Sequence, residues 1–77
     1  MNSKLKSLLA TVFQVPVERM TTDASPENLP EWDSFAMVNL VVALEESYKC
    51  TFSMEEIVRL QCAHAIEELL HEKGLLS

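Results

Sequence analysis

Apolar residues recur three and four positions apart near the start of the chain, which is the spacing of an amphipathic helix. The residues that follow this spacing are Leu5, Leu8, Leu9, Val12 and Phe13. The pattern predicts a helix over about residues 3–14. Asn2 or Ser3 can cap its first turn, and Pro16 soon ends it.

The next segment, residues 15–32, loses the helical spacing and is rich in turn-forming residues. These are Thr21, Thr22, Asp23, Ser25, Pro26, Asn28 and Pro30. We expect a long connection here, and a connection of this length in a small domain usually has a function. Four apolar side chains are expected to hold it against the helices: Val17, Met20, Leu29 and Trp32.

A second helix is predicted over about residues 34–48, with Asp33 as its N-cap. Because successive residues rotate by about 100°, one side of this helix forms a core stripe of Met37, Leu40, Val41, Leu44 and Tyr48. The opposite side is also apolar, and it presents Phe35, Val38 and Val42 beside Asn39, Glu45 and Glu46. A helix with two apolar sides is either buried all round or binds a partner. Two interpretations therefore stay open: the 15–32 connection covers the second side, or that side is a partner surface.

The C-terminal third predicts two further helices. Ser53 and Glu56 have the spacing of a capping box, which indicates a short helix ending near residue 59 or 60. The last helix is predicted from about Cys62 to Lys73, ended by Gly74, with a core stripe of Ile66, Leu69 and Leu70. No alternation typical of strands is present. We therefore expect an all-α fold, a four-helix bundle with three main helices and a short third one, as one domain over residues 1–77.

The charge distribution narrows the choice of partners. The chain has a net charge of −6. Residues 1–20 hold three basic and one acidic side chain, whereas residues 21–77 hold three basic and eleven acidic ones. Such a surface repels nucleic acid and anionic membranes and attracts basic patches. No run of about 18 apolar residues is present, so no membrane-spanning helix is expected.

The reactive side chains offer little for catalysis or metal binding. Cys50 and Cys62 are too few for a disulfide scaffold and do not have the spacing of a zinc site, so we expect reduced thiols in a cytoplasmic protein. Nothing in the sequence around Ser34 supports a triad with His64 or His71. Ser34 does, however, follow Asp33 at a helix N-terminus, where free N–H groups and the helix dipole favour a phosphate-linked group.

The order of these features resembles the acyl carrier protein family over nearly the whole chain, from about Leu5 to Leu70. The features are a helix, a long connection, the motif Asp33-Ser34-Phe35, a helix ending Leu44-Glu45-Glu46-Ser47-Tyr48, and Phe52-Ser53 before a short helix and a final one. Trp32 before the motif is similar to discrete carriers of specialised pathways. Phe35, Ala36, Asn39 and Cys62 depart from the family pattern, which leaves partner and cargo open.

The resemblance implies a carrier rather than an enzyme. A phosphopantetheinyl transferase would attach 4′-phosphopantetheine from coenzyme A to Ser34, with Asp33 helping to position the transferase. The arm would then carry acyl groups as thioesters to enzymes that offer basic docking patches. The docking face would comprise Phe35, Val38, Asn39, Val42, Glu45 and Glu46. A monomer is the default expectation.

Three questions stay open at the level of sequence. The same arm serves aminoacyl and peptidyl carriers, and the second apolar side of residues 34–48 also fits a helical interaction module without a cofactor. Further, five apolar side chains either line a groove for the cargo or form a closed core: Leu40, Leu44, Ile57, Leu60 and Ile66.

Overall fold

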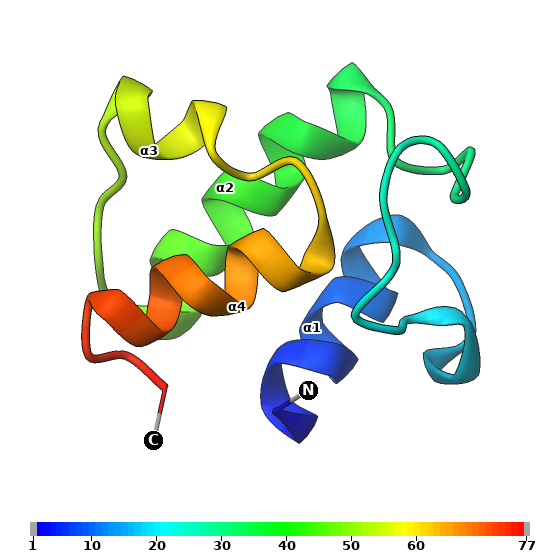
Figure 1. The fold of residues 1–77 in the computed structure, drawn as a ribbon, viewed down its shortest axis with the longest axis horizontal. Coiled ribbons are helices and arrows are strands. Elements are labelled where there is room, and N and C mark those ends of the chain that lie inside the picture. The colour runs from blue at the N-terminus through cyan, green and yellow to red at the C-terminus, as the bar shows by residue number, and fades with distance from the viewer. Residues whose placement is uncertain (1, 77) are drawn as a thin grey trace.

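Within residues 2–76, which the computed structural model describes, the chain forms four α-helices and no strand (Figure 1). The all-α expectation is therefore confirmed. The helical elements are α1 (Ser3–Phe13), the short 3-10 helix η1 (Val17–Arg19), α2 (Ser34–Tyr48), α3 (Met54–Val58) and α4 (Ala63–Glu72). No helix in the described range is both long and apolar enough to cross a membrane.

The starts of the helices follow from local side chains. The Asn2 side chain accepts hydrogen bonds from the backbone N–H groups of residues 4 and 5 and so caps α1. Ser53 and Glu56 form the predicted capping box at the start of α3. Cys62 caps α4, where its sulfur accepts from the N–H of Ala65 at 3.4 Å. These caps satisfy N–H groups that have no partner inside a helix.

The three longer helices end in the same way, each beside a residue with positive φ. These residues are Gln14 (57°), Lys49 (54°) and Gly74 (74°). In each case the N–H of the following residue returns to a carbonyl five positions back, at 3.0, 3.2 and 2.9 Å respectively. This is the Schellman arrangement. Gln14 in this conformation, rather than Pro16, therefore ends α1.

The core is one cluster of buried apolar side chains drawn from α1, α2, α4 and the connections. On α2, Leu40, Leu44 and Tyr48 are buried as predicted, whereas Met37 and Val41 lie half-buried at the edge. The side chains that were expected to line either a groove or a core include Leu40, Leu44, Leu60 and Ile66, and each is at most 1 % exposed. The closed-core interpretation therefore holds for these four side chains, whereas the fifth, Ile57, is half-buried and lines a surface hollow between α2 and α3.

The connection between α1 and α2 is ordered by its own side chains. Met20, Leu29 and Trp32 are buried, as predicted. Val17 is 41 % exposed, so its expected role is wrong: η1 lies on the surface and the chain turns inward only at Met20. The Ala24 carbonyl accepts from the N–H that opens α4 at 2.9 Å. The connection is thereby fixed against α1 and α4, on the side of the molecule away from α3 (Figure 1).

Candidate functional site

The junction between the long connection and α2 exposes Ser34 as the first helical residue. Asp33 precedes it with extended backbone, and its Oδ1 accepts from the N–H of Ala36 at 2.8 Å. The N–H groups of Ser34 and Phe35 donate to no protein acceptor within residues 2–76. The predicted cap is confirmed, and two backbone donors stay free at the positive end of the helix dipole.

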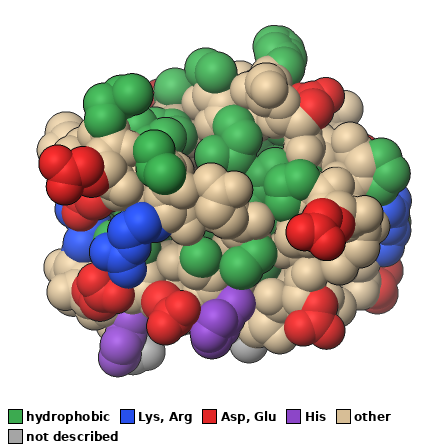
Figure 2. All heavy atoms as spheres, turned by 45° about the horizontal axis from the view of Figure 1, so that its top comes forward, with side chains coloured by type: hydrophobic (Ala, Val, Ile, Leu, Met, Phe, Trp, Pro, Cys, Tyr) green, Lys and Arg blue, Asp and Glu red, His purple; other side chains and the backbone are tan. Residues whose placement is uncertain are grey.

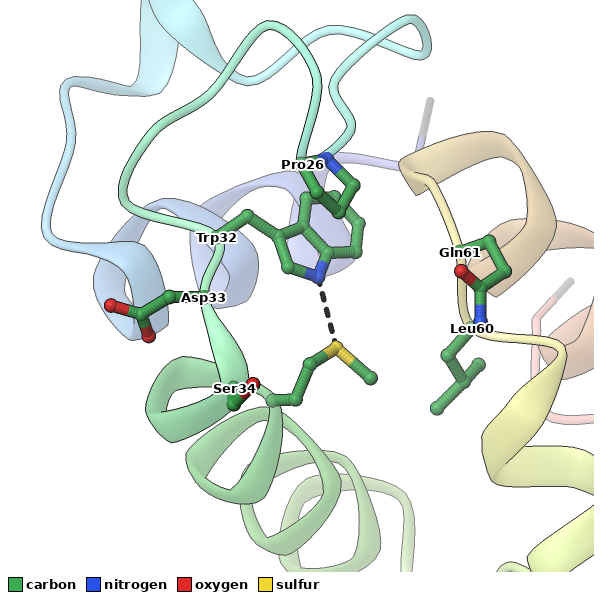
Figure 3. A pocket seen from close by; sticks show the side chains of 7 residues that line it. Pro26, Trp32, Asp33, Ser34, Leu60 and Gln61 are labelled. Carbon is green, nitrogen blue, oxygen red and sulfur yellow. Dashed lines mark hydrogen bonds between the residues drawn. The ribbon is translucent and has the colours of Figure 1, made fainter.

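Trp32 anchors this junction to the core. Its side chain is 3 % exposed and its indole ring stacks on Phe13 of α1, with ring centroids 4.6 Å apart and an interplanar angle of 28°. Its Nε1–H donates to the sulfur of Met37, in the first turn of α2, at 2.9 Å (Figure 3). One side chain therefore joins the end of the connection to both α1 and α2.

Ser34 lies at the rim of an open hollow of about 310 Å³. Pro26 and Trp32 from the connection form one wall, and Leu60 and Gln61 from the α3–α4 turn form the other (Figure 3). Met37 also lines this hollow. A chain attached to the Ser34 hydroxyl has room to leave along a largely apolar surface.

A second hollow, of about 260 Å³, lies between the end of α1 and the start of α2. Asp33, Phe35 and Asn39 line it together with Glu31. Glu31 pairs with Arg19 at 3.1 Å. A hydrogen bond from its own backbone N–H and the Arg19 guanidinium hold the pKa of the Glu31 carboxyl below its usual value. Within residues 2–76, no cluster of three or more His, Cys, Asp or Glu side chains forms that could hold a metal ion.

The second apolar side of α2 is open to solvent. Phe35 is 69 % exposed, Val38 64 % and Val42 48 %, so the interpretation that the 15–32 connection covers them is wrong. Figure 2 shows apolar side chains gathered on the face turned to the viewer. Between α2 and α3 this surface sinks into a hollow of about 290 Å³, lined by Met37, Val38, Val41, Val42 and Ile57.

Two residues of α3, Met54 and Val58, are also exposed, at 75 % and 64 %. Sequence reasoning did not select them for the docking face. The signal that points to them is their spacing of four inside a capped helix, which places both on one side. We call the five exposed side chains the apolar patch: Phe35, Val38, Val42, Met54 and Val58.

The polar residues of the predicted docking face differ in their exposure and in their hydrogen bonds. Asn39 and Glu46 are exposed. Glu45 is half-buried, and its Oε2 accepts from the backbone N–H of Phe52 at 2.9 Å. Glu45 therefore also fixes the connection between α2 and α3.

Comparison with known proteins identifies the family to which this arrangement belongs. No curated protein matches the chain. The model of the family described as "Phosphopantetheine attachment site" matches residues 3–70, which include α1, α2, α3, most of α4 and Ser34. Members of this family carry a covalently attached 4′-phosphopantetheine group. The match covers most of the 77 residues, and the chain therefore belongs to the phosphopantetheine-attachment family of carrier domains.

Proposed function

We propose that the protein is an acyl carrier in which Ser34 bears the 4′-phosphopantetheine arm. In this proposal it delivers acyl intermediates to enzymes of fatty-acid, polyketide or related biosynthesis and performs no catalysis by itself. The observation that carries the proposal is the setting of Ser34. Its hydroxyl is exposed at the first position of α2, on the rim of an open hollow, inside the region that the family matches.

The residues around Ser34 fit a phosphodiester-linked arm. The free N–H groups of Ser34 and Phe35 can donate to a phosphate, which helix N-termini stabilise by about 0.3–1 kcal/mol when exposed. Asp33 holds the first turn in place through Ala36. When bound, the arm supplies a terminal thiol that holds the cargo as a thioester. The chain itself provides the attachment oxygen, the orientation and the surface along which the arm leaves.

We further propose that partner enzymes dock on α2 beside Ser34. The partners are a phosphopantetheinyl transferase and the enzymes that load and process the acyl group. Exposed Phe35, Val38 and Val42, with Asn39, Glu45 and Glu46 beside them, suit a partner whose apolar pocket has a basic rim. Asp33 is proposed to help position the transferase. The charges serve encounter and orientation more than affinity, which suits a shuttle that must leave.

The proposed working form is a cytoplasmic monomer. Its two cysteines are free thiols in the structure, and Cys50 and Cys62 are both half-buried. Burial raises the pKa of the Cys50 thiol, which keeps it protonated near neutral pH. The cargo thiol is then the one on the arm.

The deciding experiment is the intact mass of the protein after incubation with coenzyme A, Mg²⁺ and a broad-specificity phosphopantetheinyl transferase. We expect a gain of about 340 Da, the mass of one arm. Peptide mapping should place it on the peptide that contains Ser34. A gain located on another serine would contradict the assignment of Ser34. No gain, with a transferase that loads a known carrier in parallel, would contradict the carrier function.

The docking proposal predicts a kinetic effect of Phe35→Ala. We expect kcat/KM for loading by the transferase to fall about tenfold, because truncating a large apolar anchor at the centre of an interface often costs more than 1 kcal/mol. The fold should persist, since Phe35 is 69 % exposed. Val17→Ala is the matched control, an exposed apolar side chain on η1. Equal loading rates for the two variants would place docking elsewhere.

A further inference from the structure

Ser34 lines only one of the three hollows described above, the one between the long connection and the α3–α4 turn. We call it the Ser34 hollow. Pro26 and Trp32 form one of its walls, and Leu60 and Gln61 form the other. A group attached to the Ser34 hydroxyl therefore starts inside this hollow and not in either of the other two.

Both walls of the Ser34 hollow are held in place by contacts elsewhere in the protein. Trp32 is fixed by its stacking on Phe13 and by its hydrogen bond to Met37. On the opposite wall, Leu60 is 1 % exposed. The backbone N–H of Gln61 donates to the carbonyl of Arg59 at 2.9 Å. Because these groups are already ordered, a ligand in the hollow does not have to immobilise them, which lowers the entropic cost of binding.

The Gln61 side chain offers a hydrogen-bond acceptor to the hollow. Its Nε2 donates to the carbonyl of Val58 at 2.6 Å, and this bond determines which end of the amide faces away. Within residues 2–76, no protein group donates to its Oε1. Figure 3 shows Gln61 across the hollow from Trp32, with the side-chain oxygen turned toward the hollow. Gln61 can therefore accept one further N–H without losing a bond that it already makes.

The chemical groups of a 4′-phosphopantetheine arm match these walls. After its phosphodiester, the arm has a carbon with two methyl groups, then two secondary amides, and finally the thiol. The methyl groups suit the apolar side chains of Pro26, Trp32 and Leu60. A secondary amide loses its water on an apolar surface and needs a protein partner in exchange. The Oε1 of Gln61 supplies that partner.

The hollow between α2 and α3 lacks such a partner. All five of its lining residues have apolar side chains: Met37, Val38, Val41, Val42 and Ile57. The amides of the arm would lose hydrogen bonds to water there and gain none from these side chains. The walls therefore favour the Ser34 hollow for the arm itself.

We propose that the Ser34 hollow is the resting site of the arm and that Gln61 is a positioning residue, which accepts a hydrogen bond from an amide N–H of the arm. The inference rests on the proposed function, since it requires the arm on Ser34. One hydrogen bond and a small apolar contact make a weak site. Attachment at Ser34 nevertheless keeps the arm at high effective concentration beside it. The arm rests there between partners and is released easily.

NMR of the loaded protein tests this resting site, after intact mass has shown that loading is complete. Trp32 is the only tryptophan of the chain, so its Nε1–H signal is assigned without ambiguity. We expect this signal to shift when the arm is attached, and we expect nuclear Overhauser effects between the methyl groups of the arm and the indole ring. Gln61→Leu removes the acceptor. It should speed hydrogen exchange of the bonded arm amide about fivefold, the equivalent of one net hydrogen bond.

Two further variants separate the role of Gln61 from general effects on the fold. Gln61→Glu keeps an acceptor oxygen, so it should keep the slow exchange of the arm amide that Gln61→Leu loses. Val41→Ala is the control, because Val41 lines only the α2–α3 hollow. It should leave the Trp32 signal and the exchange of the arm amide as in the loaded wild type.

The outcomes distinguish this proposal from the proposed function. With the arm on Ser34, overturning results are an unshifted Trp32 signal, Overhauser effects to Val41 and Ile57 instead of the indole, or unchanged exchange in Gln61→Leu. Each of these leaves the carrier function intact. A protein that a working transferase cannot load would overturn both proposals together.

Discussion

Ser34→Ala is expected to lose the coenzyme A-dependent mass gain completely while it keeps the wild-type fold. The variant lacks the only atom to which the arm is proposed to attach. Stability should change by no more than about 0.5 kcal/mol, because Ser34 is exposed and alanine is well suited to a helix. The Asp33 cap on Ala36 is unaffected. Intact-mass spectrometry and urea unfolding followed by circular dichroism measure the two properties.

Ser3→Ala is a closely matched control for this experiment. Ser3 is also an exposed serine at the first position of an α-helix, and it too follows a capping residue, Asn2. Its variant should load like the wild type. If Ser34→Ala retained the mass gain, the attachment site would lie elsewhere, whatever the behaviour of Ser3→Ala.

Trp32→Ala should have the largest effect on stability, a loss of about 3–5 kcal/mol in the free energy of unfolding. The side chain is almost fully buried, so its removal leaves a cavity beside Phe13 and ends the aromatic stacking. The bond to Met37 is lost as well. For a domain this small, such a loss is a large share of the total stability. Urea unfolding followed by circular dichroism gives the value.

Two substitutions separate the contributions of Trp32. Trp32→Phe keeps an aromatic ring against Phe13 but has no N–H for Met37, and it should cost clearly less than alanine. Phe35→Ala removes an aromatic side chain that is 69 % exposed, and it should cost no more than about 0.5 kcal/mol. A loss below about 1 kcal/mol for Trp32→Ala would show that the indole does not anchor the junction.

Features that depend on neighbouring residues could be predicted from the sequence. The caps Asp33, Ser53 and Cys62 act on N–H groups three positions ahead, so spacing alone identifies them. The boundaries of α2 agree with the prediction for the same reason, since a cap begins the helix and apolar periodicity continues it. The candidate serine follows directly from that helix start.

Features that depend on distant parts of the chain could not be predicted in this way. The exposure of Val17 depends on where η1 lies against the bundle. The role of Glu45 depends on Phe52, seven residues later, whose N–H it accepts. Gln14 and Lys49 have left-handed backbone although neither is a glycine, so the residue type does not indicate this conformation. Periodicity shows which side of a helix is apolar, but not which other segment covers it.

Helix α3 belongs to two surface features at once. It contributes Ile57 to the α2–α3 hollow, and its residues Met54 and Val58 belong to the apolar patch. Any protein that binds the patch across both helices therefore also contacts the helix that forms one wall of the hollow. Thermodynamic linkage makes such a coupling reciprocal. A partner that moves α3 changes the shape of the hollow. If the partner thereby changes the affinity of the hollow for an occupant, the occupant changes the affinity for the partner by the same factor.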